Sequence, residues 1–362
     1  MDAFAVKPSS EGLLLPSSIE RVFITDRCFR SYDMTEKAFS ADTLRLDSTA
    51  EVEAIGAFMR QALTKDFRRR GIVVGISGGI DSAVTAALAV KCLGKDRVYC
   101  LLMPERESSP DTLTLSRQMV DHLGVRFAHE DITGSLEAVG FYSRYQDAVR
   151  RVVPEYGPGW GSKLVATESM ERGGFTFFSL VVADPQGVSR TVRLPIEVYL
   201  EIVATTNFKQ RLRKLLEYYY ADRWNFAVAG TPNLLEYDQG FFVKNGDGAA
   251  DLKPIAHLYK TQVYQLAEHL GVPQAIRSRP PTTDTFSLAQ GQDEFYFALP
   301  YQKMDLCLYG LNHQVEATAV GRAAGLTEDQ VRKVWANLQQ KRSTVHYQHA
   351  PPLVIRRPPD IR

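Results

Sequence analysis

Apolar and polar residues along this chain follow two alternating patterns. One consists of short, uncharged, β-branched runs, which are typical of strands buried on both faces of a sheet. The other consists of longer stretches with apolar residues at helical spacing. Strands that alternate with helices over short connections indicate a parallel sheet covered by helices. The pattern therefore predicts an α/β fold with a doubly wound parallel sheet. The expected strands are 71–76, 97–103, 224–230 and one that begins at 125, and the expected helices are 49–66, 82–94, 110–124 and 207–222.

One internal stretch, residues 141–200, departs from this alternation. It contains the loop-like sequence YGPGWGSK and then two β-rich runs on either side of Asp184-Pro185-Gln186-Gly187. Because that tetrapeptide has good turn residues, we predict a β-hairpin inserted into the α/β framework. The irregular residues 1–48 are expected to form an N-terminal extension, 49–345 the main domain, and the proline-rich 346–362 an extended surface tail.

Composition and charge narrow the functional classes. The 362 residues carry a formal net charge of +1, which favours neither nucleic acid nor an anionic membrane as a partner. No apolar run reaches the roughly 18 residues of a transmembrane helix, and the first residues lack a signal-peptide pattern, so we expect a cytoplasmic protein without membrane attachment. The four cysteines show no Cys-x-x-Cys spacing and the seven histidines no ligand spacing, so no zinc site is assigned.

A glycine-containing loop, SGGIDS at 77–82, follows the strand at 71–76 and opens the next helix. Gly78 and Gly79 allow a tight turn whose backbone N–H groups can face phosphate oxygens. The hydroxyls of Ser77 and Ser82 add donors, and the helix N-terminus adds partial positive charge. Asp81 can hold a magnesium ion. The loop is neither a Walker A motif nor a dinucleotide fingerprint. The alternative is a turn that merely caps a helix.

In this context the loop resembles the PP-loop of enzymes that cleave ATP to AMP and pyrophosphate. Three further blocks resemble the ammonia-dependent NAD synthetase family within that superfamily. The resemblance covers most of 52–345 apart from 141–200, and it implies an adenine nucleotide alpha hydrolase-like fold. The blocks are NFKQRLR at 207–213, GTPNLLEYDQGFFVKNGDGAADLKPIAHLYKTQVYQLAEHLGV at 230–272 and RPPTTDTFSLAQGQDE at 279–294.

The resemblance also implies roles for individual residues. The metal ligands would be Asp81, Glu236 and Thr282, and the catalytic residues Asp81, Glu236, Lys260 and Asp247. ATP would be bound by Ser77, Gly78, Gly79, Asp81, Ser82, Met103, Thr231, Lys260 and Thr282. The dinucleotide substrate would be bound by Asn207, Arg211, Phe241, Lys244, Asp247 and Asp251.

The implied reaction uses ATP and Mg²⁺ to adenylate a substrate carboxylate, which ammonia then converts to an amide. The substrate would be deamido-NAD and the product NAD. The resemblance also implies that the enzyme is a homodimer. Charge dispersed over the α-phosphate in the transition state makes a metal ion and a lysine the expected main contributors. Asp247 is a candidate for helping ammonium lose its proton. The chain has no room for the glutaminase domain of glutamine-dependent relatives, so free ammonia or a separate partner would supply nitrogen.

Two other functions stay open at this point. The insertion and the loop Pro-Thr-Thr-Asp-Thr-Phe, where the family often has Pro-Thr/Ser-Ala-x-Leu, are compatible with a ligase that adenylates another carboxylate in specialised metabolism. A non-catalytic nucleotide-binding protein is the alternative of another class. Such a protein would not need the phosphate-binding and the metal-binding residues together. The basic residues at 209–214 also have a simple alternative reading, as a solvated helix face.

Overall fold

The computed structural model describes residues 39–168, 176–281, 285–288 and 299–355. The chain divides into two compact units, Met1–Ala38 and Phe39–Arg362, and all described residues belong to the second. Thr282, a predicted ATP and metal ligand, lies outside the described residues.

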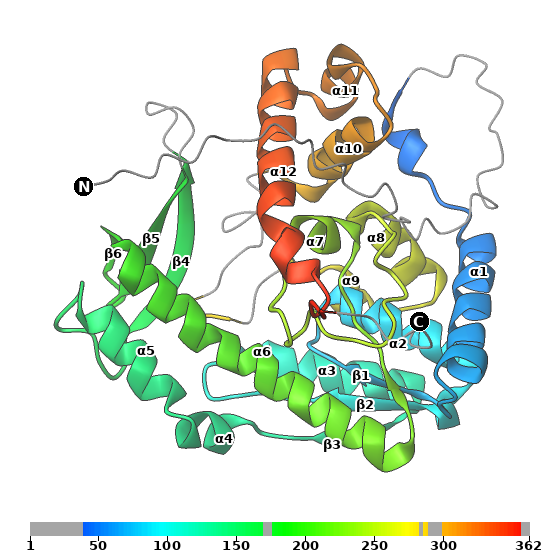
Figure 1. Cartoon of the computed structure of the whole chain (residues 1–362), viewed down its shortest axis with the longest axis horizontal. Coiled ribbons are helices and arrows are strands. Elements are labelled where there is room, and N and C mark those ends of the chain that lie inside the picture. Colours follow the sequence, from blue (N-terminus) through cyan, green and yellow to red (C-terminus); the bar gives the residue numbers. More distant parts are fainter. Residues whose placement is uncertain (1–38, 169–175, 282–284, 289–298, 356–362) are drawn as a thin grey trace, which may run out of the picture. The chain divides into compact units, whose positions relative to one another are not determined.

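The main sheet has four parallel strands in the order β3-β2-β1-β7, of which β1, β2 and β3 are labelled in Figure 1. Within it, Val74 of β1 pairs with Cys100 of β2, and Ile72 pairs with Ala227 of β7. The strands are β1 (Ile72–Gly75), β2 (Val98–Leu102), β3 (Arg126–His129) and β7 (Ala227–Val228). The predicted parallel sheet is confirmed, although β7 is shorter than the predicted 224–230. Beyond it, the Ala229 amide donates to the carbonyl of Val73 at 3.0 Å, and an isolated bridge joins Ala229 to Leu252.

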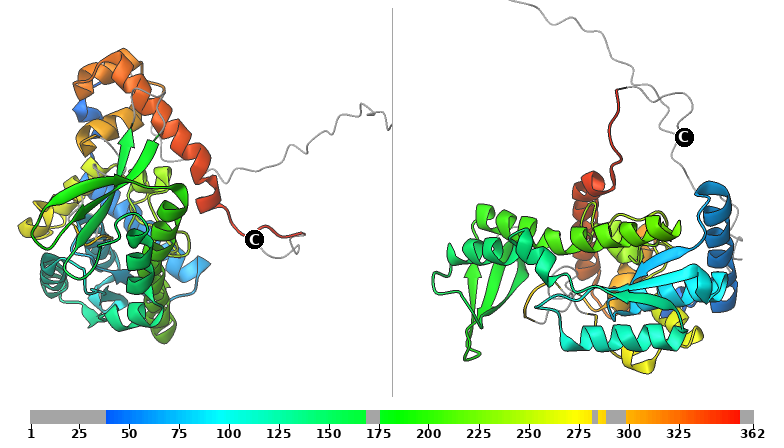
Figure 2. Two further views of the ribbon diagram at one scale, coloured as in Figure 1. Left: turned by 90° about the vertical axis from the view of Figure 1, so that its left-hand side faces the viewer. Right: turned by 90° about the horizontal axis from the view of Figure 1, so that it is seen from below.

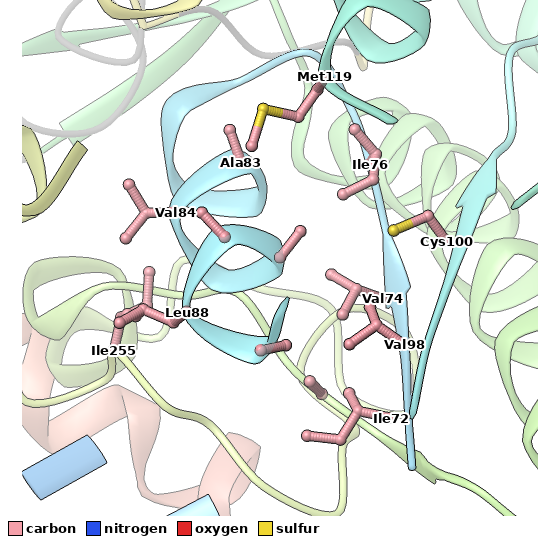
Figure 3. Packing of buried hydrophobic residues seen from close by; sticks show 14 of the residues in the cluster. Ile72, Val74, Ile76, Ala83, Val84, Leu88, Val98, Cys100, Met119 and Ile255 are labelled. Atoms are coloured by element: carbon pink, nitrogen blue, oxygen red, sulfur yellow. The ribbon is translucent and has the colours of Figure 1, made fainter. Parts of the chain in front are cut away.

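Alternate side chains of the strands enter two different cores. Ile72 and Val74 of β1 pack into a cluster with α1 (Ser48–Gln61), α2 (Ile80–Leu93) and α8 (Lys260–His269) (Figure 3). Val73, between them, packs into a second cluster with α6 (Ile196–Trp224). Figure 2 shows α6 and α3 (Pro110–Leu123) on opposite sides of the strands. Helices therefore cover both faces, and the doubly wound arrangement is confirmed.

The predicted C-terminal ends of the helices agree closely with the structure. Gly94 follows α2 with φ of 86°, and Gly124 follows α3 in the left-handed conformation with φ of 61°. The first helix continues as a π-turn at Ala62–Asp66. Helix α6 is much longer than the predicted 207–222, because its first turns bury Val198 and Ile202 in the core of the insertion.

The insertion folds as a separate antiparallel sheet of order β4-β5-β6 (Figure 1). Its strands are β4 (Gly161–Glu168), β5 (Thr176–Ala183) and β6 (Ser189–Arg193). The β5–β6 hairpin turns where predicted, with Asp184 Oδ1 accepting hydrogen bonds from the amides of Gln186 (2.9 Å) and Val188 (2.8 Å). Strand β4 begins inside the stretch that was predicted to be a loop, and it pairs with β5, so the hairpin is part of a larger sheet. This sheet packs its buried face on α5 (Phe141–Arg150) and α6.

The remaining helices complete the unit. Helices α10 (Tyr301–Asn312) and α12 (Glu328–His349) share a core cluster with Leu235 of α7 (Leu234–Gln239), beside α8. Residues 350–355 follow α12 without regular structure. Helix α12 thus includes the first residues of the predicted tail. Within the described ranges, no helix has both the length and the apolar character needed to cross a membrane. The bounds are η1 Ala41–Leu44, η3 Lys95–Arg97, α4 Thr133–Ala138, α7 Leu234–Gln239, α9 Gln274–Arg277, α10 Tyr301–Asn312, α11 Ala317–Ala324 and α12 Glu328–His349.

Candidate active site

The glycine-containing loop connects β1 to α2 at the carboxyl edge of the parallel sheet. Gly78 has φ of 71°, and a Cβ there would lie 2.9 Å from the carbonyl oxygen of Thr112. Only glycine fits this position without strain. The Ser82 hydroxyl donates to the carbonyl of Gly79 (3.0 Å), and the Ser77 amide donates to Ser82 Oγ (3.3 Å). The loop is thus held in a tight turn at the positive end of α2, an arrangement suited to anions.

Two carboxylates and one lysine meet beside this loop. Asp81, in the first turn of α2, accepts hydrogen bonds from Lys260 Nζ and from Asn233 Nδ2, the latter at 3.2 Å. Glu236 lies on α7, where its carboxylate accepts the amide of Asn233 at 3.1 Å and its own amide donates to Asn233 Oδ1 at 3.2 Å. This capping box fixes Glu236 at the start of its helix. The three chemical groups therefore come from three separate helices.

The electrostatics of this cluster favour a cation. Burial alone would lower the pKa of Lys260, whose side chain is 1% exposed, but the carboxylates of Asp81 and Glu236 outweigh burial and raise that pKa. Two carboxylates against one ammonium leave a net negative charge. Magnesium is usually held by one or two carboxylates together with substrate phosphates and water, so this pair suits it. Among the described residues there is no group of three or more His, Cys, Asp or Glu side chains placed to hold a metal alone.

A cavity of about 570 Å³ opens beside the loop and the acidic cluster. It brings together residues from all four sequence blocks. The predicted site residues in its wall are Ser77, Gly79, Asp81, Ser82, Met103, Asn207, Arg211, Thr231, Glu236, Phe241, Lys244, Asp247 and Lys260.

The predicted dinucleotide-binding residues form another part of the wall. Asp247 Oδ1 accepts the amide of Val243 at 2.7 Å, while burial raises the pKa of Asp247 above its usual value. Lys244 Nζ donates to the carbonyl of Tyr347 at 2.7 Å, which ties this segment to the end of α12. Arg211 Nε donates to the carbonyl of Lys244 at 3.3 Å. These contacts fix the segment in place.

Comparison with known proteins identifies the family. The model of the NAD synthase family matches residues 51–155 and 187–351. This chain belongs to the NAD synthase family. The unmatched residues 156–186 contain both β4 and β5, so the family match omits most of the inserted sheet.

Relatives in the NAD synthase family match over most of their length. An NH(3)-dependent NAD(+) synthetase of Rhizobium meliloti (strain 1021) is 56% identical over 323 residues, covering 89% of this chain and 96% of that relative. One of Mesorhizobium japonicum is 58% identical over 311 residues, covering 86% and 98%. The solved NH3-dependent NAD synthetase of Campylobacter jejuni has the same fold, with a TM-score of 0.56 at 21% identity over 86% of this chain and all of that one. The NMN synthetase of Francisella tularensis gives a TM-score of 0.58 at 20% identity over 86% and 99%.

Among the described residues implied by the family resemblance, two do not line the cavity. Gly78 shapes the loop instead, with its Cα facing the start of α3. Asp251 accepts hydrogen bonds from the Val228 amide at 2.7 Å and the Tyr218 hydroxyl at 3.3 Å. Its carboxylate therefore binds the edge strand β7 and helix α6 instead of lining the cavity.

The cavity is also lined by charged residues that were not predicted as site residues. Arg279 donates to Thr112 Oγ1 at 3.2 Å, and its guanidinium lies beside Gly78. Glu217 forms a buried ion pair with Lys214 at 2.5 Å, against Gly75 at the end of β1. Arg279 begins a family-like block and could have been selected from that position. The pairing of Lys214 with Glu217 at i,i+3 is visible in the sequence, but its burial is not.

A network of buried charges is centred on Lys209 of α6. Lys209 Nζ, 1% exposed, contacts Glu105 at 2.8 Å, Glu107 at 3.0 Å and the carbonyl of Thr285 at 3.1 Å. The lysine and the Tyr142 hydroxyl (2.8 Å) stabilise the Glu105 carboxylate, so its pKa is lowered despite burial. Lys209 and Lys214 are both buried, so the interpretation of 209–214 as a solvated face is wrong for these two.

Proposed function

We propose that this chain converts deamido-NAD to NAD, using ammonia as the nitrogen donor and ATP as the energy source, with release of AMP and pyrophosphate. One observation carries the proposal. The phosphate loop, the Asp81–Lys260–Glu236 cluster and most of the predicted dinucleotide-binding residues line one cavity. The relatives that match over nearly their whole length are named NH(3)-dependent NAD(+) synthetases, which supports NAD as the product and ammonia as the nitrogen donor.

ATP is assigned to the part of the cavity next to the phosphate loop. Ser77, Ser82 and Lys260 provide donors and positive charge for the phosphates, and Thr231 and Met103 lie in the same wall. Asp81 and Glu236 would hold Mg²⁺. That ion, when bound, would neutralise charge on the phosphates and favour attack at the α-phosphorus. Thr282 remains a predicted third ligand.

The reaction then proceeds in two steps. An oxygen of the substrate carboxylate attacks the α-phosphorus, and the bond to the β-phosphate breaks with pyrophosphate leaving. Lys260 stabilises the charge that spreads over the phosphate oxygens. The nitrogen lone pair of ammonia next attacks the acyl carbon, the C–O bond to AMP breaks, and a proton leaves the nitrogen. Asp247, whose pKa is raised, is the proposed acceptor of that proton, because a base works best with a pKa near the operating pH.

Assembly as a homodimer is proposed with this activity. Helix α6 exposes four large apolar side chains, each more than half exposed, and we expect a second copy to cover this apolar surface. They are Ile196, Leu200, Leu215 and Tyr219. The cytoplasmic location, the source of ammonia and the predicted domain boundaries at 48 and 345 stay predictions.

The activity is tested by incubating the purified protein with magnesium, ATP, ammonium and deamido-NAD. We expect NAD and AMP to form in equal amounts, and glutamine in place of ammonium to give far less NAD. A folded protein that binds ATP yet forms no NAD would contradict the proposal, and ATP-dependent amidation of another carboxylate would replace it.

A further inference from the structure

The inserted sheet reaches the cavity with an apolar surface that no block of the family resemblance includes. Leu164 of β4, Phe178 of β5, and Tyr199 and Val203 of α6 all line it. The rings of Phe178 and Tyr199 are stacked, with centroids 4.0 Å apart and planes inclined by 13°. We call these four residues the aromatic wall. Its surface is suited to a flat apolar ring rather than to phosphates.

The aromatic wall is part of a fixed body. The Leu288 amide donates to the carbonyl of Ser162 on β4 at 3.2 Å, and the Ser162 amide donates to Ser287 Oγ at 2.9 Å. Phe286, which also lines the cavity, is 8% exposed and packs in the core of the insertion. The segment 285–288 is thus held against the insertion. Contacts of this kind hold the wall in place, which lowers the ordering cost of binding.

Helix α6 shows how far this wall lies from the phosphate loop. Tyr199 and Glu217 both line the cavity and both belong to α6. At 1.5 Å of rise per residue, they are about 27 Å apart along the helix axis. Glu217 is at the loop end, because a Cβ on Gly75 would lie 2.8 Å from its Oε1. The aromatic wall is therefore at the end of the cavity remote from the residues assigned to ATP phosphates.

We propose that the aromatic wall binds the adenine base at the non-reacting end of deamido-NAD, and so makes the insertion a determinant of acceptor specificity. This inference rests on the proposed function. The reacting carboxylate must reach the α-phosphate of ATP, which places the pyridine ring toward the phosphate end. The acceptor's second ring is a purine, and bases bind aromatic side chains by stacking. Apolar contact at the far end would favour a dinucleotide over a mononucleotide with the same carboxylate.

The test compares Tyr199→Leu and Phe178→Leu with the wild-type enzyme. Each change keeps an apolar side chain and removes one ring. We expect kcat/KM for deamido-NAD to fall about 10-fold or more, as for loss of one stacked base, while the KM for ATP stays unchanged. The inhibition constant of nicotinic acid mononucleotide, which lacks the adenosine end, should stay unchanged.

Two matched variants, together with the melting temperature of each variant, separate a binding role from a folding defect. Tyr199→Phe keeps the ring and should behave as wild type. Trp160→Leu removes a ring from the same insertion that does not line the cavity, and should leave acceptor kinetics unchanged. If the wild-type enzyme makes NAD and both leucine variants retain its KM for deamido-NAD, or raise the KM for ATP instead, the aromatic wall is not the adenine site. Absence of NAD from the wild type would overturn the proposed function itself.

Discussion

At the residue scale, the site depends on a balance of charges that no single residue could maintain. Lys260 is buried and yet charged, because Asp81 and Glu236 face it. Removal of either carboxylate disturbs both the lysine and the proposed magnesium position. The cluster therefore acts as one unit, and single substitutions in it should not be additive.

Neutral replacements of the two carboxylates test the metal assignment. We expect Asp81→Asn and Glu236→Gln each to lower the rate of deamido-NAD-dependent ATP–pyrophosphate exchange by about 100-fold or more, the size found when a preorganised electrostatic contact is lost. The matched control is Glu268→Gln, on the exposed surface of α8, where the side chain is 78% exposed. Near-normal exchange in both site variants would contradict the assignment.

Asp247 should affect the second step more than the first. We expect Asp247→Asn to retain deamido-NAD-dependent ATP–pyrophosphate exchange and to form NAD at least about 10-fold more slowly, because general base catalysis contributes roughly 100-fold or more. In the wild type, NAD formation should fall as the pH drops through the raised pKa of Asp247, since the protonated carboxyl cannot accept a proton. Equal loss of both activities would show that Asp247 binds substrate instead.

Residue identity in the site could be predicted from sequence where a motif is local. The loop at 77–82 lies between an evident strand and an evident helix, so its position needed no tertiary information. Glu217 reaches the same cavity only through the packing of distant segments, whereas Arg279 could have been selected from the block that it begins. Asp251 matches a family position, but its contacts with Val228 and Tyr218 depend on the folded sheet edge.

At the element scale, the helix α6 links the two sheets of the molecule. Its first turns pack on the inserted sheet and its last turns on the parallel sheet. Between them, Lys209 joins α6 to Glu105 and to the segment at Thr285. A buried charge in this position is tolerated only while its partners remain.

Breaking this pair should therefore destabilise the fold. We expect Lys209→Met to lower the free energy of unfolding by about 3–5 kcal/mol, because the fully buried Glu105 carboxylate is left without its main partner. Adding Glu105→Gln to that variant should restore part of the loss. Urea unfolding of the two single variants and the double variant measures the coupling. Additive effects would show that the pair is not coupled.

The insertion shows why an element can escape prediction. The β5–β6 hairpin was predictable because the turn residues at 184–187 lie between two clear β runs. Strand β4 begins after a glycine-rich stretch, and its inward position 162 is a serine rather than an apolar residue. Ser162 is buried because the hydroxyls of Tyr145 and Tyr156, each 2.9 Å away, pair with its own hydroxyl. A polar residue made acceptable by tertiary contacts concealed the alternating pattern.

At the scale of the whole molecule, a single chain leaves the four large apolar side chains of α6 exposed. We expect Leu200→Glu with Leu215→Glu to convert a wild-type dimer into monomers in sedimentation velocity, because burying two carboxylates in an apolar interface is costly. Leu353→Glu, on an exposed residue after α12, is the matched control and should leave the mass unchanged. A monomeric wild type would contradict the proposed dimer.

The central claim is that the substrate carboxylate, rather than a protein group, is adenylated at the Asp81–Lys260–Glu236 cluster and then amidated. The most direct measurement uses deamido-NAD labelled with ¹⁸O in both carboxylate oxygens. Attack by that carboxylate on the α-phosphorus, followed by departure of AMP, should transfer one ¹⁸O atom to AMP for each NAD formed and leave the other in the amide. NAD formed with unlabelled AMP, or label recovered in pyrophosphate, would contradict the account.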